Sequence, residues 1–175
     1  IRPFILNQVN DFYRAHMEGF ICIGLQLRMS KHVYNRASIQ DYINEINTIL
    51  KKHPKEKVKI FAASDSYDAI QHLKRVFGER VIYIDAPRKN GNDDPVFDSP
   101  NFKVGYAGGI GALKDCLLLS KCDYFIHIIS NLANFVVFFN PEIKSIFLPR
   151  NRPYKACEIR DKNNLNNPYL FGSHI

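Results

Sequence analysis

Two hydrophobic periods alternate along this chain, and that alternation most constrains its fold. Short apolar runs rich in β-branched residues are followed by longer stretches whose apolar side chains recur at helical spacing. The short runs predict five strands, at 21–27, 58–62, 81–84, 124–128 and 145–148. The longer stretches predict helices over 4–17, 38–50, 66–77, 108–120 and 131–139. This order predicts an α/β fold: a doubly wound, Rossmann-like parallel sheet of about five strands with helices on both faces.

The length of 175 residues fits one domain. We expect a Rossmann-like domain over 1–149 and a C-terminal tail over 150–175 that packs on it or on a missing partner domain. Residues 85–107 are rich in Asp, Asn, Pro and Gly without periodicity, which predicts a functional or mobile loop. The chain begins with Ile1, so we interpret it as a piece of a longer protein.

The charge and the cysteines narrow the class of protein. A formal net charge of +7 favours an anionic partner, although solubility alone explains it equally well. No basic stripe interleaved with aromatic residues is present, so we expect no nucleic acid partner. The cysteines form no CxxC pair and are expected to be buried free thiols; they are Cys22, Cys116, Cys122 and Cys157. The sequence contains no HxH, HExxH or Asp-rich triplet, so we expect no metal site.

The sequence is compatible with more than one cellular compartment. No apolar run reaches the ~18 residues that a membrane span needs, so none is expected in this segment. The absence of Asn-x-Ser/Thr sequons and of a signal peptide favours the cytoplasm. A Golgi or endoplasmic reticulum lumen stays compatible if the segment comes from a longer chain.

Strand order selects the part of the chain where a ligand would bind. The simplest order is 3-2-1-4-5, and ligands of such sheets lie outside the carboxyl ends of the strands, where the order reverses between strands 1 and 4. The segments that reach this edge are 28–37, 63–66, 85–107 and 128–131. No Gly-x-Gly-x-x-Gly follows the first strand and no P-loop is present. His127 lies within the fourth strand, and we expect it to be a satisfied core histidine rather than a catalyst.

Five side chains are the candidates at this edge. Arg28 directly follows the first strand and has paired donors for a diphosphate. Ser130 and Asn131 begin the helix after the fourth strand, where free N–H groups and the helix dipole suit a phosphate; helix capping explains them as well. Asp65 follows the second strand, either as an acceptor for a ribose or base or as a helix cap. Asp115 borders a strongly apolar helix face, so we expect it to have a dedicated partner: a base N–H, Lys114 or a backbone group.

Three segments, in matching order, resemble motifs of the superfamily of α1,6-fucosyltransferases, NodZ and protein O-fucosyltransferases. Ile23-Gly24-Leu25-Gln26-Leu27-Arg28 is similar to its Ile-Gly-x-His-x-Arg strand. Phe61-Ala62-Ala63-Ser64-Asp65-Ser66 resembles its apolar strand that ends in Thr/Ser-Asp-Asp/Ser. The stretch from Leu113 to Ala133 resembles its third motif. The resemblance covers residues 5–148.

The resemblance implies the donor half of a GT-B glycosyltransferase, paired with an absent N-terminal acceptor-binding domain, that binds GDP-fucose or a related GDP-sugar without a metal. The acceptor would be a glycan, a protein or a lipid-linked hydroxyl. Arg28 would match the arginine that binds the diphosphate, and Asp115 the carboxylate that pairs with guanine. Asp65 and Ser130 would match positions that contact the donor. Beyond GDP-sugar as donor substrate, no cofactor is implied.

The sequence departs from the family pattern around Arg28. Gln26 replaces the histidine, Met29 replaces a second arginine, and Lys31 replaces an aspartate. Gln26 still forms hydrogen bonds but is neither acid nor base, so we count it among the donor-binding residues. Lys31 supplies a positive charge that, with Arg28, would offset charge on the leaving diphosphate. These departures leave a second interpretation open: a catalytically degenerate module that binds a nucleotide or a partner.

Overall fold

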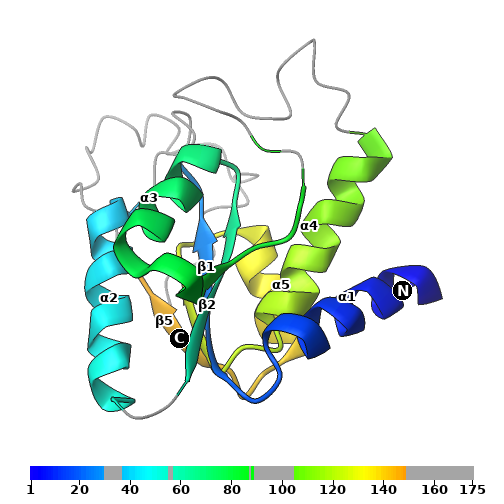
Figure 1. Ribbon diagram of the computed structural model, residues 1–175. Coiled ribbons are helices and arrows are strands. Elements are labelled where there is room, and N and C mark those ends of the chain that lie inside the picture. Colours follow the sequence, from blue (N-terminus) through cyan, green and yellow to red (C-terminus); the bar gives the residue numbers. More distant parts are fainter. Residues whose placement is uncertain (30–36, 55–56, 87, 89–104, 149–175) are drawn as a thin grey trace, which may run out of the picture.

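The structure is built on one parallel sheet of five strands in the order β3-β2-β1-β4-β5 (Figure 1). It is a computed structural model that describes residues 1–29, 37–54, 57–86, 88 and 105–148. The strands are β1 (Ile21–Leu27), β2 (Val58–Ser64), β3 (Val81–Ile82), β4 (Tyr124–His127) and β5 (Lys144–Phe147). The predicted order and the doubly wound α/β class are confirmed, and the order reverses between β1 and β4.

Helices cover both faces of the sheet (Figure 1). One face carries α2 (Ile39–Lys52) and α3 (Tyr67–Phe77), and a 3₁₀ turn, η1 (Gly78–Arg80), follows α3. The other face carries α1 (Pro3–His16), α4 (Gly105–Leu119) and α5 (Asn131–Phe139). Each face has its own buried core because successive strand residues point to opposite sides. In β1, Ile23, Leu25 and Leu27 belong to the α2–α3 core, whereas Cys22 belongs to the α4 core.

Serine side chains set the start of three helices. Ser38 and Asp41 form a capping box at α2, because each side chain accepts from the other residue's backbone N–H. Ser66 accepts from the Ala69 N–H at the start of α3, and Ser130 does the same for α5. These caps satisfy N–H groups that have no partner inside the helix. They also fix where each chain segment turns at the carboxyl edge of the sheet.

Most expected boundaries agree with the structure to within two or three residues. β2 extends to Ser64, two residues beyond the prediction, and β3 ends at Ile82 rather than at residue 84. Helix α4 begins at Gly105, within the stretch predicted to be a loop. The rest of that loop, apart from residues 85, 86 and 88, lies outside the described residues, as do the tail 150–175 and Cys157. Cys22, Cys116 and Cys122 are buried free thiols, as predicted.

Gly24 lets α4 approach the middle of β1. A Cβ at this position would lie 2.9 Å from Leu119 Cδ2 and 3.0 Å from Cys122 Sγ. Both atoms are the ends of side chains and can shift by part of an ångström, so we expect Gly24→Ala to destabilise the protein by about 1 kcal/mol. The matched control is Gly109→Ala in α4, where a Cβ meets nothing within 4 Å. That substitution should stabilise the helix by about 0.5–1 kcal/mol. Urea unfolding of both variants tests the pair, and a stabilised Gly24→Ala would contradict the close approach.

No helix of the described residues combines the length and apolar character needed to cross a bilayer.

Candidate functional site

Arg28 follows β1 directly, at the carboxyl edge of the sheet. The main chain is held both before and after it. The Met29 N–H donates to Asp65 Oδ1 at 2.9 Å, and the Tyr42 hydroxyl donates to the Gln26 carbonyl at 2.7 Å. Pairing with β2 continues up to Leu27, opposite Ser64. The half-buried Arg28 side chain therefore starts from a main chain that β2 and α2 both hold in place.

Asp65 holds the backbone of the neighbouring loop. The sequence allows two roles for it, a ligand contact or a helix cap. The cap of α3 is Ser66 instead, and Asp65 accepts from the main chain beyond Arg28. Its carboxylate has a second oxygen that this hydrogen bond does not use. The interaction makes Asp65 a positioning residue for Arg28, and the predicted contact with donor stays a prediction.

Ser130 and Asn131 lie at the start of α5, beside the end of β1. Ser130 Oγ accepts from the Ala133 N–H at 3.0 Å, so the predicted capping role is confirmed. The N–H groups of the first helical turn, Asn131 and Leu132, have no partner within a helix of this kind. They carry the positive end of the helix dipole and point toward the carboxyl edge. The hydroxyl proton of Ser130 adds a further donor.

The strand register brings Arg28 and the start of α5 to the same level. Leu25 pairs with Ile126 across β1 and β4, so Arg28 is level with residue 129 when the register is continued. Neighbouring strands lie about 4.8 Å apart. Both groups carry positive charge and donate hydrogen bonds, and both lie where the strand order reverses. The arrangement can hold a diphosphate, because Arg28 approaches from one strand and the helix N–H groups approach from the next.

Gln26 lies beneath this edge, on the face covered by α4. Its side chain is 3% exposed, and its Oε1 has no hydrogen-bond partner among the described residues. Strand alternation places it on the side of Cys22 and Gly24, away from the α2–α3 core. A buried amide oxygen without a donor is costly, and such atoms mark sites that take a ligand or water. Gln26 therefore stays a candidate binding residue.

Asp115 lies on the stripe of α4 that faces the sheet. Gly111 and Leu119 flank it one turn away on either side, and they approach Ala86 and Gly24 respectively. Leu119 lies opposite Gly24. Asp115 is one helical turn from Leu119, and Gln26 is two strand residues from Gly24, which is a similar distance. Asp115 therefore lies at about the height of Gln26. Its side chain is buried, and Oδ1 has no partner among the residues that the structure describes. The expected protein partner for this oxygen, Lys114 or a backbone group, is therefore not found.

Burial raises the pKa of Asp115 to about 7, and the nearby positive charge of Arg88 opposes this rise. Desolvation disfavours the charged carboxylate, and the guanidinium compensates only in part. A carboxyl group with a raised pKa, buried below the edge where doubly wound sheets bind ligands, is a functional-site candidate.

Arg88 is a polar residue of this edge that sequence reasoning missed. It follows β3, and its Nη1 donates to the carbonyls of Ile84 and Ala86, at 2.8 and 3.1 Å. Its guanidinium lies 5.4 Å from the ring centre of Tyr83. The Nε and Nη2 atoms are buried without a partner among the described residues. The segment 85–107 is one of those that strand order assigns to this edge, so position after a strand was the available signal.

The sequence analysis also singled out Lys31 and His127. Lys31 lies outside the described residues. His127, expected to be a satisfied core histidine, has both ring nitrogens in hydrogen bonds, with Ser145 Oγ at 2.7 Å and the Ile128 carbonyl at 3.1 Å. Burial lowers its pKa, and the bond to Ile128 raises it less. The prediction that its ring nitrogens are satisfied is confirmed, but the side chain is half-buried rather than part of the core.

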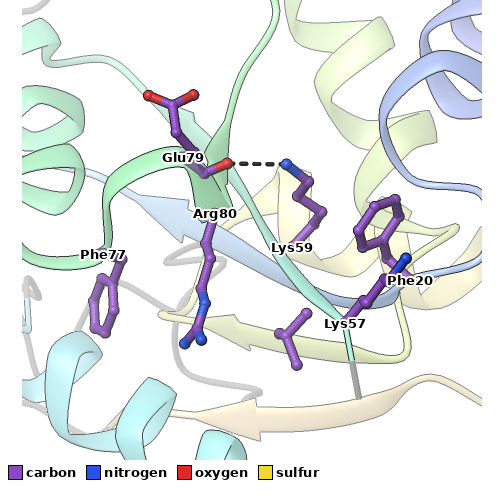
Figure 2. A pocket seen from close by; sticks show the side chains of 7 residues that line it. Phe20, Lys57, Lys59, Phe77, Glu79 and Arg80 are labelled. Atoms are coloured by element: carbon purple, nitrogen blue, oxygen red, sulfur yellow. Dashed lines mark hydrogen bonds between the residues drawn. The ribbon is translucent and has the colours of Figure 1, made fainter. Parts of the chain in front are cut away.

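A hollow of about 500 Å³ opens at the opposite edge of the sheet (Figure 2). Lys57, Lys59 and Arg80 surround it, and Lys59 Nζ donates to the Glu79 carbonyl at 2.9 Å. It lies where β2 begins, whereas ligands of doubly wound sheets bind where strands end. In the described part of the chain, no three His, Cys, Asp or Glu side chains gather into a possible metal site.

The chain has the Rossmann-like α/β fold of GT-B fucosyltransferases. It superimposes on NodZ α-1,6-fucosyltransferase from Bradyrhizobium with a TM-score of 0.54, at 20% identity, over 80% of this chain and 43% of that one. NodZ co-crystallized with GDP gives the same TM-score. POFUT1 in complex with GDP-fucose matches with a TM-score of 0.54 at 12% identity, over 83% of this chain and 46% of that one.

These likenesses show a shared fold, and the chain spans less than half the length of the structures that it matches. No protein-family model and no curated protein sequence matches the chain.

The role of Asp65 can be tested by removing its hydrogen bond. We expect Asp65→Ala to weaken GDP binding about fivefold, because the loss of one hydrogen bond of about 1 kcal/mol releases the main chain beside Arg28. Asp65→Asn keeps a carbonyl oxygen for the Met29 N–H and should restore most of the affinity. Calorimetric titration measures both, and Asp11→Ala on the exposed surface of α1 is the control. Equal losses in the Ala and Asn variants would show that the charge of Asp65, rather than its hydrogen bond, matters.

Proposed function

We propose that this chain is the donor-binding half of a glycosyltransferase, of the fucosyltransferase type, that holds a GDP-sugar for transfer to an acceptor hydroxyl. The observation that carries the proposal is the meeting of Arg28 with the start of α5 where the strand order reverses. Solved structures with this fold were determined with GDP and with GDP-fucose. The resemblance of three sequence motifs to the same superfamily supports it independently.

In the proposed complex, Arg28 and the N–H groups of Asn131 and Leu132 bind the diphosphate. Ser130 adds its hydroxyl, and Asp65 keeps the main chain beside Arg28 in position. Lys31, three residues beyond Arg28, adds positive charge. Asp115 and Gln26 lie below the edge as acceptors for the nucleoside. A metal ion is not required in this scheme, because protein donors balance the charge of the diphosphate.

The transfer reaction uses this arrangement directly. The acceptor oxygen forms a bond to the anomeric carbon of the sugar, while the bond from that carbon to the β-phosphate oxygen breaks. GDP leaves with the electron pair, and the proton of the acceptor hydroxyl passes to solvent. Arg28 and the helix N–H groups stabilise the charge that develops on the leaving diphosphate, which lowers the barrier. Fucose as the sugar, and inversion at its anomeric carbon, are what the resemblance implies.

Gln26 favours one alternative, a module that binds the nucleotide without turnover. The residue occupies the place of the family's histidine, it is buried, and an amide transfers no proton at neutral pH. Release or transfer of the sugar from GDP-fucose by the full-length protein separates the two functions. Turnover supports the enzyme, whereas tight binding without turnover supports the module.

Calorimetric titration of the 175-residue chain with GDP, GDP-fucose, ADP and UDP tests the proposal. We expect binding that prefers the two guanine nucleotides. A folded chain that binds none of them at millimolar concentration would contradict the proposal for this chain. Binding of all three diphosphates with equal affinity would support the diphosphate site and contradict the choice of base.

A further inference from the structure

Three polar side chains on the α4 side of the sheet have buried atoms without partners among the described residues. They are Oε1 of Gln26, Oδ1 of Asp115, and the pair Nε and Nη2 of Arg88. Two of these are acceptors and one is a donor pair. A buried donor or acceptor left unsatisfied costs about 1–3 kcal/mol. Buried groups left without a partner in the free protein are expected to find one in a ligand or an ordered water.

Arg88 presents its free donors in a fixed direction. Two carbonyls of its own segment bind Nη1, and the ring of Tyr83 lies beside the guanidinium. A planar guanidinium held along one edge keeps Nε and Nη2 pointing in one plane. The arrangement is typical of recognition of an oxygen in a planar group rather than of a solvated surface charge.

Arg88 and Asp115 lie near each other without bonding to each other. The charge of Arg88 acts on the carboxyl of Asp115, yet no hydrogen bond joins the two side chains. A donor and an acceptor that both lack a protein partner fit a ligand edge with an acceptor beside a donor. Among nucleobases, a carbonyl oxygen next to a ring N–H forms such an edge, called here the lactam edge. Guanine, hypoxanthine and uracil have it, whereas adenine and cytosine present the reverse order.

The segment that carries Arg88 approaches α4 close to Asp115. A Cβ at Gly111 would lie 3.3 Å from Ala86 Cβ, and Gly111 is one helical turn from Asp115. Both groups therefore lie on the α4 side of the sheet, the side on which strand alternation places Gln26.

We infer that Arg88 is a specificity-determining residue that binds the carbonyl oxygen of the nucleobase, beside the ring N–H that the resemblance assigns to Asp115. The inference rests on the proposed function, since it uses the diphosphate site to anchor the nucleotide. It assigns to Arg88 a role that neither the sequence motifs nor the fold comparison provides.

A purine ligand without a lactam edge tests the inference. The panel is GDP, inosine diphosphate, ADP and the diphosphate of 2-aminopurine riboside, which keeps the purine and its amino group but has neither O6 nor the adjacent ring N–H. We expect Arg88→Ala to weaken GDP and inosine diphosphate about tenfold, the equivalent of one charge-assisted hydrogen bond. Binding of the 2-aminopurine compound should change less than about twofold, because it has no oxygen for Arg88 to bind.

Matched variants separate recognition from folding. Arg88→Lys keeps the charge and should restore part of the preference for GDP over the 2-aminopurine compound. Arg80→Ala, at the opposite edge of the sheet, should leave every affinity unchanged. Thermal melts of each variant verify that it is folded. An Arg88→Ala variant that loses affinity equally for both purines, or for neither, would overturn the inference.

The design separates this failure from a failure of the proposed function. If the wild-type chain binds GDP and Arg28→Ala weakens the binding of every diphosphate equally, the proposed diphosphate site is supported, independently of the result for Arg88. If the folded wild-type chain binds no nucleoside diphosphate, the proposed function and the inference are both overturned. Preference for ADP over GDP would overturn the inference and leave the diphosphate site intact.

Discussion

Replacing Arg28 with alanine is expected to weaken the binding of GDP and of GDP-fucose by about 10- to 100-fold. A charge-assisted hydrogen bond to a phosphate contributes about 1.5–3 kcal/mol, and no other charged side chain among the described residues directly follows β1. Because the lost contact is with the diphosphate, ADP and UDP should lose the same factor. Calorimetric titration of the variant against the wild type measures the change.

Two variants sharpen the result. Arg28→Lys keeps the charge but not the planar pair of donors, so its affinity should lie between those of the wild type and Arg28→Ala. Arg80→Ala removes the same charge at the opposite edge of the sheet and should have no effect on nucleotide binding. Equal losses in Arg28→Ala and Arg80→Ala would indicate a general effect of net charge and would contradict a diphosphate site at Arg28.

Replacing Asp115 with asparagine is expected to stabilise the free protein at pH 8 by an amount on the order of 2–4 kcal/mol. Burial raises the pKa of Asp115 from its ordinary value to about 7 in the folded state. Between about pH 4 and pH 7 the folded state therefore binds more protons than the unfolded state. The contribution of Asp115 to stability falls as pH rises through this window and is constant above it.

Asparagine is uncharged at every pH, so the variant should lose this part of the pH dependence. Thermal unfolding of both proteins from pH 4 to pH 9 measures it, with Asp11→Asn as the exposed control. The curves of wild type and Asp115→Asn should converge at low pH and separate toward pH 8. Parallel curves would show that Asp115 does not change its pKa on folding. The same variant should lose the preference for GDP over ADP, because an amide offers a donor as well as an acceptor.

The sheet and its helices could be predicted because each element has a strong local signal. Ser38, Ser66 and Ser130 precede apolar faces with helical spacing, and all three cap their helices. β3 and α4 were placed less well. Only two residues of β3 pair with β2, so the sequence does not indicate where this strand ends. Glycines lie in the first turns of α4, and their low helix propensity hides where this helix begins.

The candidate site was only partly visible in the sequence. Arg28, Asp65, Ser130 and Asn131 follow strands or begin helices, so the rule on strand order selected them, and the structure brings them to one edge. The hydrogen bond from Met29 to Asp65 joins residues 36 positions apart, and no local pattern encodes it. Arg88 was missed because its position in a segment that reaches this edge is shared by many other polar residues of 85–107, and only its neighbours in space distinguish it.

The tether between Asp65 and Met29 has a consequence for protein engineering. β1 and the carboxylate of Asp65 hold the main chain up to Met29 by contacts that involve no residue beyond it. Substitutions beyond Met29 are therefore expected to leave the main chain of Arg28 in place. They offer a way to vary the proposed donor site while the proposed diphosphate anchor is kept.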